Sequence, residues 1–253
     1  MIIPILGPSE CRVWWTCADE QPISDLIWPL SESERSRAAG YRREEDRRRF
    51  VAAGWLLRTV AAAQLAASPA DIIIERRCAD CGKNHGKPRI VTDSHRELHA
   101  SISHSGTRVG VALCTAGMVG VDVEDLSPAP GGIAYCALSS AEQAALSRLP
   151  EHERETGFVE MWVRKEAALK ATGHGLQIPP EQVEVTGPRQ SPAVLSWPLD
   201  VPPDRLRLWE LDPGPGFAGV VAVLGGSEPV SVSESYVGGC RPAGRTDRTL
   251  VAV

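Results

Sequence analysis

The stretch Gly120–Asp125, which reads Gly-Val-Asp-Val-Glu-Asp, lies near the middle of the 253-residue chain. Apolar and β-branched residues alternate from Met118 to Val123, and this pattern predicts a strand. Side chains two residues apart on a strand share a face, so Asp122 and Glu124 should lie side by side. Two neighbouring carboxylates repel each other unless a cation lies between them, and Mg²⁺ prefers oxygen ligands. The stretch therefore predicts either a Mg²⁺ site or an edge strand with a solvated polar face.

The composition is that of an ordinary soluble globular protein. With 253 residues and 43% hydrophobic residues, the chain can form one large domain or two modest ones. The formal net charge of −5 gives no overall signal for binding nucleic acid or an anionic membrane. Met1–Pro8 lacks a basic leader and no stretch is long and apolar enough to span a membrane, so we expect a cytoplasmic protein. The seven cysteines are scattered and odd in number, which favours free thiols.

Capping and periodicity signals divide the chain into helices and strands. Ser31 is a natural N-cap, Ser139 or Ser140 is another, and Gly173 is suited to end a helix. The predicted helices are Glu32–Tyr41, Phe50–Leu65, Ser139–Leu149 and Glu153–Thr172. The other predicted strands are Arg12–Ala18, Ile72–Glu75, Leu98–Ser103, Val109–Leu113, Val183–Thr186, Leu206–Leu211 and Gly219–Leu224.

The order of these elements repeats within the chain. The helix at Phe50 and the helix at Phe158 are offset by 108 residues, as are the hairpins that begin at Leu98 and Leu206. We therefore expect an α+β fold of two similar halves, each a small antiparallel sheet packed with a long helix, with a ligand cleft between them. The expected parts are residues 1–117, residues 118–225 and a flexible Ser-, Gly- and Arg-rich tail over residues 226–253.

Two basic or metal-binding patterns allow alternative interpretations. The arginines between residues 35 and 49 could converge on a phosphate or form a solvated helical surface. Cys78, Cys81 and His85 are zinc-ligand types, but a closed zinc site needs four ligands and the sequence offers no local fourth one. Gly86-Lys87-Pro88 predicts a turn that lets the backbone approach a ligand, with Lys87 free to bind a phosphate or a base edge.

Polar residues on the hairpin and on the last long helix are further candidates. Ser103-His104 lacks both a hydrolase elbow and an orienting acid, so a serine nucleophile is disfavoured. His104 could donate to an anion or bond to backbone in a turn. Glu166 and Lys170 are four residues apart and therefore neighbours on the helix surface. They form either an exposed ion pair or, given their apolar surroundings, part of a site.

The motifs taken together resemble the Sfp-type 4'-phosphopantetheinyl transferases. The matching stretches are Gly86-Lys87-Pro88, Ser101–Ser105, Gly120–Glu124 and Trp162–Lys170. The double length resembles the pseudo-dimeric, monomeric class of this fold. The resemblance implies that the chain transfers the 4'-phosphopantetheine group of coenzyme A to a serine of an apo acyl or peptidyl carrier protein and releases 3',5'-ADP.

The resemblance also implies a role for each matching residue. Asp122, Glu124 and Glu166 would hold Mg²⁺, Glu166 would be the base for the carrier serine, and Lys170 would stabilise the leaving diphosphate. Lys165 would help to bind the phosphates. The implied contacts to the 3'-phosphate and adenine of coenzyme A are Arg49, Ser103, His104, Lys87 and Pro88.

The carrier is expected to dock over Leu126–Leu138 and the following helix, with Arg148 and Arg164 as basic contacts. Two other functions remain as alternatives. One is a non-catalytic carrier-binding or nucleotide-binding protein of the same fold, although all the implied catalytic residues are present. The other is a Mg²⁺-dependent phosphodiesterase or nuclease, which the acidic net charge and the missing basic groove disfavour.

Overall fold

The computed structural model describes residues 3–77, 82–92, 97–127, 132–226, 228–238 and 248–250, without the side chains of His85 and Arg248. The interpretation of Cys78, Cys81 and His85 as zinc ligands therefore lies outside the described residues. The helices are α1 (Ile23–Leu26), α2 (Glu32–Ala39), α3 (Glu44–Leu65), α4 (Ser140–Ser147) and α5 (Arg154–Thr172). The strands are β1 (Glu10–Cys17), β2 (Ile73–Arg77), β3 (Asn84–Val91), β4 (His99–Ser105), β5 (Arg108–Cys114), β6 (Gly117–Asp125), β7 (Glu184–Val185), β8 (Val194–Ser196), β9 (Leu206–Leu211), β10 (Phe217–Gly225), β11 (Ser231–Tyr236) and β12 (Arg248–Leu250).

Two unequal sheets form the centre of the molecule. Within the described residues, the larger sheet has seven strands in the order β12-β11-β1-β5-β4-β3-β2, and the smaller has three in the order β6-β10-β9. Neighbouring strands are antiparallel except β1 and β11, which are parallel. The strands β7 and β8 pair separately. The α+β class expected from the sequence is confirmed, as are the predicted hairpins β4–β5 and β9–β10.

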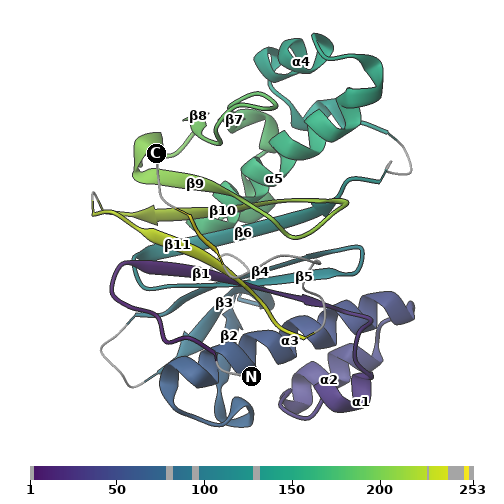
Figure 1. Ribbon diagram of the computed structural model, residues 1–253, viewed down its shortest axis with the longest axis vertical. Coiled ribbons are helices and arrows are strands. Elements are labelled where there is room, and N and C mark those ends of the chain that lie inside the picture. The colour runs from purple at the N-terminus through teal and green to yellow at the C-terminus, as the bar shows by residue number, and fades with distance from the viewer. Residues whose placement is uncertain are drawn as a thin grey trace.

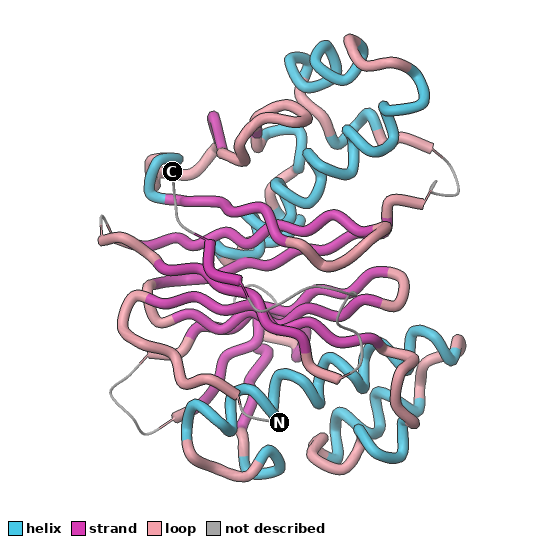
Figure 2. The backbone as a smooth tube through the Cα atoms, in the orientation of Figure 1, coloured by secondary structure: helices cyan, strands magenta, loops and turns pink. Residues whose placement is uncertain are grey.

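The layers run helix, sheet, sheet, helix (Figure 1). Helix α3 packs on the outer face of the larger sheet, and one apolar cluster fills the space between them. Helix α5 covers the outer face of the smaller sheet over a second cluster. A third cluster joins the two sheets, with Val13 and Trp15 of β1 facing Val121 of β6 and Val221 of β10. Figure 2 shows the same arrangement, with helices at both ends of the molecule and strands between them.

Local signals set the helix ends. Ser31 and Ser139 both form capping boxes, because each accepts a backbone N–H and in turn receives a glutamate side chain on its own N–H. Gly173 ends α5 with a φ of 83°. Helix α3 begins at Glu44, earlier than the expected Phe50. Three acidic residues in its first turn favour this earlier start, because negative charge stabilises a helix N-terminus.

The tripeptide Gly86-Lys87-Pro88 lies within β3 and does not form the expected turn. Its effect appears in the pairing with β2, where Glu75 pairs with Arg89 but Arg77 pairs with Asn84, so the register shifts. Proline has no N–H to donate to a neighbouring strand, and an irregular, loosely paired strand tolerates it.

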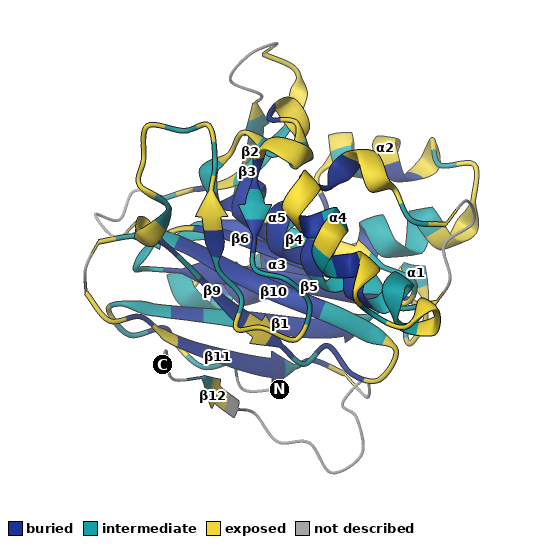
Figure 3. Cartoon of the chain, turned by 90° about the horizontal axis from the view of Figure 1, so that it is seen from above, coloured by how far each residue is buried: buried dark blue, intermediate teal, exposed yellow. Residues whose placement is uncertain are grey.

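The expectation of a flexible tail is wrong for residues 231–236. This segment is β11, which lies between β1 and β12 in the larger sheet. Val232 and Glu234 are almost completely buried, and the Trp15 indole N–H donates to Glu234 Oε1 at 2.9 Å. Figure 3 shows β11 among the buried strands, whereas α2 carries many exposed residues. The polar composition hid the strand, because two of its serines, Ser233 and Ser235, are buried in the sheet.

Four cysteines in the described part of the chain are free thiols, namely Cys11, Cys17, Cys114 and Cys136. This agrees with the thiols expected from the sequence. None of the described helices combines the length and the apolar character that a membrane span requires.

Candidate active site

Strand β6 and helix α5 place acidic and basic side chains around one pocket of about 310 Å³. Asp122 and Glu124 reach it from the same face of β6, as the alternation predicted, and Glu166 and Lys170 reach it from α5. Strands β4 and β2 of the larger sheet complete the wall, together with Trp162 of α5 and Leu176. The pocket is lined by Arg76, Ile102, Ser103, His104, Asp122, Glu124, Trp162, Glu166, Lys170 and Leu176.

Asp122 is the most deeply buried acid of the pocket, with only 2% of its surface exposed. Its Oδ1 lies 2.6 Å from Lys170 Nζ and accepts a hydrogen bond of 2.8 Å from Ser103 Oγ. Its other oxygen, Oδ2, is buried without a hydrogen-bond partner among the described residues. Burying a carboxylate oxygen without a partner costs free energy. The unpartnered Oδ2 therefore indicates that the pocket binds a cation or a hydrogen-bond donor.

Glu124 and Glu166 are half-buried beside this pair. Burial raises the pKa of Glu124, and the charge of Asp122 raises it further, while hydrogen bonding to Ser105 and the Lys170 charge oppose the rise. Burial likewise raises the pKa of Glu166, where Lys170 opposes the effect and the other two carboxylates add to it. Glu166 Oε1 is also buried without a partner among the described residues.

The donor set fits a hard divalent cation. Carboxylate oxygens are the preferred protein ligands of Mg²⁺, and Asp122 Oδ2 and Glu166 Oε1 have no other partner in the described part of the chain. The described residues nevertheless contain no three His, Cys, Asp or Glu side chains grouped closely enough to form a ready metal cage. Lys170 instead neutralises Asp122. The pocket is therefore suited to a cation that brings ligands of its own, as Mg²⁺ does with phosphate and water.

A row of three serines on β4 joins the pocket to the larger sheet. We call Ser101, Ser103 and Ser105 the serine row. Their hydroxyl oxygens accept hydrogen bonds from successive outward N–H groups of β6, at 3.0, 3.3 and 3.1 Å. The donors, in order, are the backbone amides of Val121, Val123 and Asp125. The serine row thus replaces strand pairing along this edge of β6, whose only paired neighbour in the described residues is β10.

His104 and Arg49 lie at the mouth of the pocket. His104 is exposed and lines the pocket, yet the protein atoms around its ring lower its pKa, and the nearby charges of Lys170 and Arg49 lower it further. Arg49 does not line the pocket. Its guanidinium donates to the Gly106 carbonyl at 2.9 Å and pairs with Asp46 at 2.6 Å. This places a cation beside the β4–β5 turn that follows His104.

The structure places Lys165 away from the pocket, contrary to the expected phosphate contact. Its ammonium group is fully buried, lies 2.6 Å from Glu142 Oε2 and donates to the carbonyls of Pro180 and Val183. Consecutive helical positions differ by about 100° in direction, and here Lys165 lies on a different side of α5 from Glu166. Lys165 therefore fastens α5 to α4 and to the segment around residue 180.

The structure gives Lys87 and Ser103 partners within the protein. Lys87 Nζ donates to the Ala171 carbonyl at 2.9 Å, near the C-terminus of α5, and burial lowers the pKa of Lys87 to about 8. Neither Lys87 nor Pro88 lines the pocket. Ser103 does line the pocket. Its hydroxyl donates a hydrogen bond to Asp122 and accepts one from Lys170 Nζ at 3.1 Å.

Sequence reasoning missed Arg76 of β2, which lines the pocket. Burial lowers the pKa of its guanidinium, and Glu34 opposes this effect. Arg76 reaches the pocket through the order of strands in the larger sheet, where β3 lies between β4 and β2. This order cannot be predicted from the residues around Arg76. The available sequence signal was the pair Arg76-Arg77. Neighbouring side chains of a strand point to opposite faces of the sheet, so each face receives one of the two arginines.

A smaller and more apolar pocket of about 210 Å³ adjoins the first and shares Glu124 and Trp162 with it. The rings of Phe158 and Trp162 stack at its edge, with centroids 6.2 Å apart. Leu126 and Ile133 also line it. The charged pocket thus opens beside an apolar surface on the segment that follows β6.

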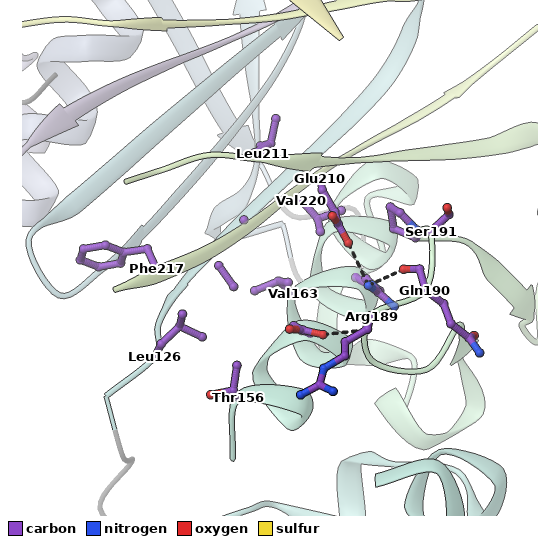
Figure 4. Close-up of a pocket in the computed structure, with 15 residues that line it drawn as sticks. Leu126, Thr156, Val163, Arg189, Gln190, Ser191, Glu210, Leu211, Phe217 and Val220 are labelled. Atoms are coloured by element: carbon purple, nitrogen blue, oxygen red, sulfur yellow. Dashed lines mark hydrogen bonds and ion pairs between the residues drawn. The ribbon is translucent and has the colours of Figure 1, made fainter. Parts of the chain in front are cut away.

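A third pocket, of about 430 Å³, lies between α5, the residues around 190 and the β9–β10 hairpin (Figure 4). Arg164 lines it but is 1% exposed, and its guanidinium donates to the carbonyls of Thr186, Gly187 and Gln190 and pairs with Glu210 at 3.1 Å. The expectation that Arg164 contacts a carrier protein is therefore wrong, because the side chain is used inside the fold.

Comparison with known proteins gives the family. Residues 118–223 match the sequence profile of the 4'-phosphopantetheinyl transferase superfamily. The 4'-phosphopantetheinyl transferase HetI of Nostoc sp. is 30% identical over 227 residues, covering 86% of this chain and 89% of that protein. The transferase Sfp of Bacillus subtilis is 26% identical, covering 73% of this chain and 79% of that protein. The chain belongs to the 4'-phosphopantetheinyl transferases, a family of enzymes, which confirms the family expected from the motifs.

Two further matches cover less. A Synechocystis sp. protein named for the same transferase activity is 32% identical, covering 64% of this chain and 65% of its own length, just under two thirds. The solved holo-[acyl-carrier-protein] synthase of Thermotoga maritima is 20% identical with a TM-score of 0.37, covering 47% of this chain and 70% of that one.

Proposed function

We propose that this chain transfers the 4'-phosphopantetheine group of coenzyme A to a serine hydroxyl of an apo acyl or peptidyl carrier protein, releasing 3',5'-ADP. The observation that carries the proposal is the pocket itself. It gathers three carboxylates and one ammonium group, and it leaves Asp122 Oδ2 and Glu166 Oε1 without partners among the described residues. Family membership supports the reaction class.

Glu166 is the proposed base for the carrier serine. A base that works near neutral pH needs a pKa above that of an ordinary carboxyl group, and burial raises the pKa of Glu166. Its unpartnered Oε1 can accept the serine proton directly or through one water molecule. The proton leaves the hydroxyl as the serine oxygen attacks the β-phosphorus of coenzyme A, and the bond from that phosphorus to the bridging oxygen breaks.

Lys170 is the proposed electrostatic partner of the leaving diphosphate half. Its ammonium group already bridges Asp122 and Ser103, so it is held in place before the reaction begins. A positioned cation stabilises negative charge that develops on the leaving oxygen. Mg²⁺ held by Asp122, Glu124 and Glu166 would neutralise charge on the pyrophosphate.

The 3'-phosphate of coenzyme A is proposed to lie near His104 and Arg49. Arg76, which lines the pocket together with His104, is a third basic side chain proposed to lie near this phosphate. Lys165 and Lys87 are left out, because the first is bound to Glu142 and the second to the Ala171 carbonyl. We further propose that the protein acts as a monomer in the cytoplasm. Its double length supports the first point, and the free thiols of Cys11, Cys17, Cys114 and Cys136 support the second.

The test is mass spectrometry of purified apo carrier proteins incubated with the enzyme, coenzyme A and Mg²⁺. The expected result is one added phosphopantetheine group on the carrier serine. Glu166→Gln should abolish the adduct, whereas Glu160→Gln should leave its formation unchanged, because Glu160 lines the third pocket on another face of α5. Coenzyme A binding without an adduct on several carriers would favour a non-catalytic binding protein.

A further inference from the structure

The serine row does more than join the two sheets. Each of its three hydroxyls accepts one backbone N–H of β6, so the role at the edge of that strand is the same for all three. A serine hydroxyl still has one proton to donate. The destination of that proton differs along the row, and this difference separates a structural serine from one that acts on the site.

Ser105 directs its proton to Glu124. Its Oγ donates to Glu124 Oε2 at 2.6 Å while it accepts the Asp125 N–H at 3.1 Å. The distance is in the short range typical of a hydroxyl donating to an ionised carboxylate. Because the Asp125 amide fixes the oxygen and the carboxylate takes the proton, the Ser105 hydroxyl has a defined direction. One oxygen of Glu124 is thereby held in place.

The other two serines provide an internal comparison. Ser103 donates to Asp122, but Lys170 holds the same carboxylate oxygen independently. Ser101 accepts the Val121 N–H at 3.0 Å and is buried away from the pocket lining. Glu124, the carboxylate that Ser105 contacts, has no ion pair with Lys170 among the described residues and is otherwise hydrogen-bonded by Trp162.

We infer that Ser105 is a positioning residue that orients Glu124 as a ligand for the divalent cation. The inference rests on the proposed function in one respect, namely that Glu124 binds the cation. Residues that orient the ligands of a metal ion typically change its affinity by about 10-fold to 100-fold when they are removed. Ser105 has this position, since it contacts the carboxylate without lining the pocket.

The experiment titrates Mn²⁺, as a spectroscopic probe, into the full chain saturated with coenzyme A. Free Mn²⁺ is followed by electron paramagnetic resonance, which does not depend on turnover. Ser105→Ala should weaken Mn²⁺ binding by about 10-fold or more. Ser105→Thr keeps the hydroxyl and should restore most of the affinity. Ser101→Ala should bind Mn²⁺ like the parent, although it also loses one bond to β6.

Thermal unfolding of Ser105→Ala and Ser101→Ala tests whether weaker Mn²⁺ binding merely reflects a general loss of stability. Both lose one hydrogen bond to a β6 amide, so both should lose a similar amount of thermal stability. Equal Mn²⁺ affinity for the parent and Ser105→Ala would overturn the inference, as would an equal loss in Ser101→Ala. A parent that modifies carriers but binds no Mn²⁺ would also overturn it. A parent that modifies no carrier, with the expected Mn²⁺ difference intact, would overturn the proposed function and leave the inference standing.

Discussion

Lys170 Nζ lies 2.6 Å from Asp122 Oδ1, so a cation on helix α5 meets a buried carboxylate of strand β6. Ser103 of β4 binds both groups and thereby links the contact to the larger sheet. The pair draws together three elements that are distant in the sequence. It neutralises one carboxylate while Glu166 and Glu124 remain available to a cation.

Replacement of Asp122 tests the centre of this arrangement. Asp122→Asn keeps the shape of the side chain but removes its charge, so we expect kcat to fall by about 100-fold or more while the fold is kept. Steady-state kinetics of carrier modification and far-ultraviolet circular dichroism measure the two effects. An Asn variant as active as the parent would rule out a role for the Asp122 charge.

Replacing the two lysines of α5, Lys165 and Lys170, should give opposite results. Lys165→Met leaves Glu142 buried without its cation, and loss of one partner of a buried pair costs about 3–5 kcal/mol. The free energy of unfolding should therefore fall, with the KM for coenzyme A unchanged in the folded fraction. Urea titration and kinetics at low temperature provide both measurements.

Lys170→Met is the matched control for Lys165→Met. It should lower kcat by about 100-fold or more and alter stability less, because the Lys170 side chain is partly exposed. If Lys165→Met instead raised the KM for coenzyme A without loss of stability, Lys165 would contact the phosphates after all.

Much of the fold and part of the site could be predicted from local sequence. Ser31 and Ser139 identified helix starts because a cap is formed by residues within one turn. The shared face of Asp122 and Glu124 followed from the two-residue period of a strand.

Other features depend on contacts between distant segments and could not be read from local patterns. Glu142 lies 23 positions before Lys165, and only the packing of α4 on α5 brings these charges together. Arg76 enters the pocket through the order of strands in the sheet. Strand β11 was missed because its serines resemble a flexible linker until they are placed between β1 and β12.

Lys87 makes stability depend on pH in the alkaline range. Its pKa is lowered from 10.5 to about 8 by burial, so between these values the unfolded chain binds more protons than the folded one. The free energy of unfolding should therefore rise with pH across this window. After allowance for partial exposure, the rise relative to Lys87→Met should be about 1–2 kcal/mol.

Urea unfolding at several pH values from 7.5 to 10.5 measures this contribution. The exposed Lys83 provides the control, because Lys83→Met should show the same pH dependence as the parent. Parallel curves for the parent and Lys87→Met would contradict the prediction.

Glu234 should be essential for stability. Its Oε1 accepts both the Trp15 indole N–H and the Asp212 backbone N–H, each at 2.9 Å. Glu234→Ala leaves these donors without that acceptor, which should cost about 2–4 kcal/mol. Ser231→Ala, at an exposed position of the same strand, should change stability by less than about 0.5 kcal/mol. Denaturant titration of both variants checks the difference.

Arg148 is the remaining basic residue proposed to contact a carrier. It is exposed at the C-terminal end of α4, whereas Arg164 is buried. Arg148→Glu should raise the KM for an acidic carrier several-fold with little change in the KM for coenzyme A. Equal changes in the two constants would show that the substitution acts on the catalytic site.

The parallel pairing of β1 with β11 also governs how the protein can fold during synthesis. Residues 10–15 form this pairing with residues 231–236, so more than two hundred residues separate the partners. The β1 edge that receives β11 remains without this neighbour until that late segment has emerged from the ribosome. Such long-range pairing slows folding and leaves a strand edge open to other chains in the interval.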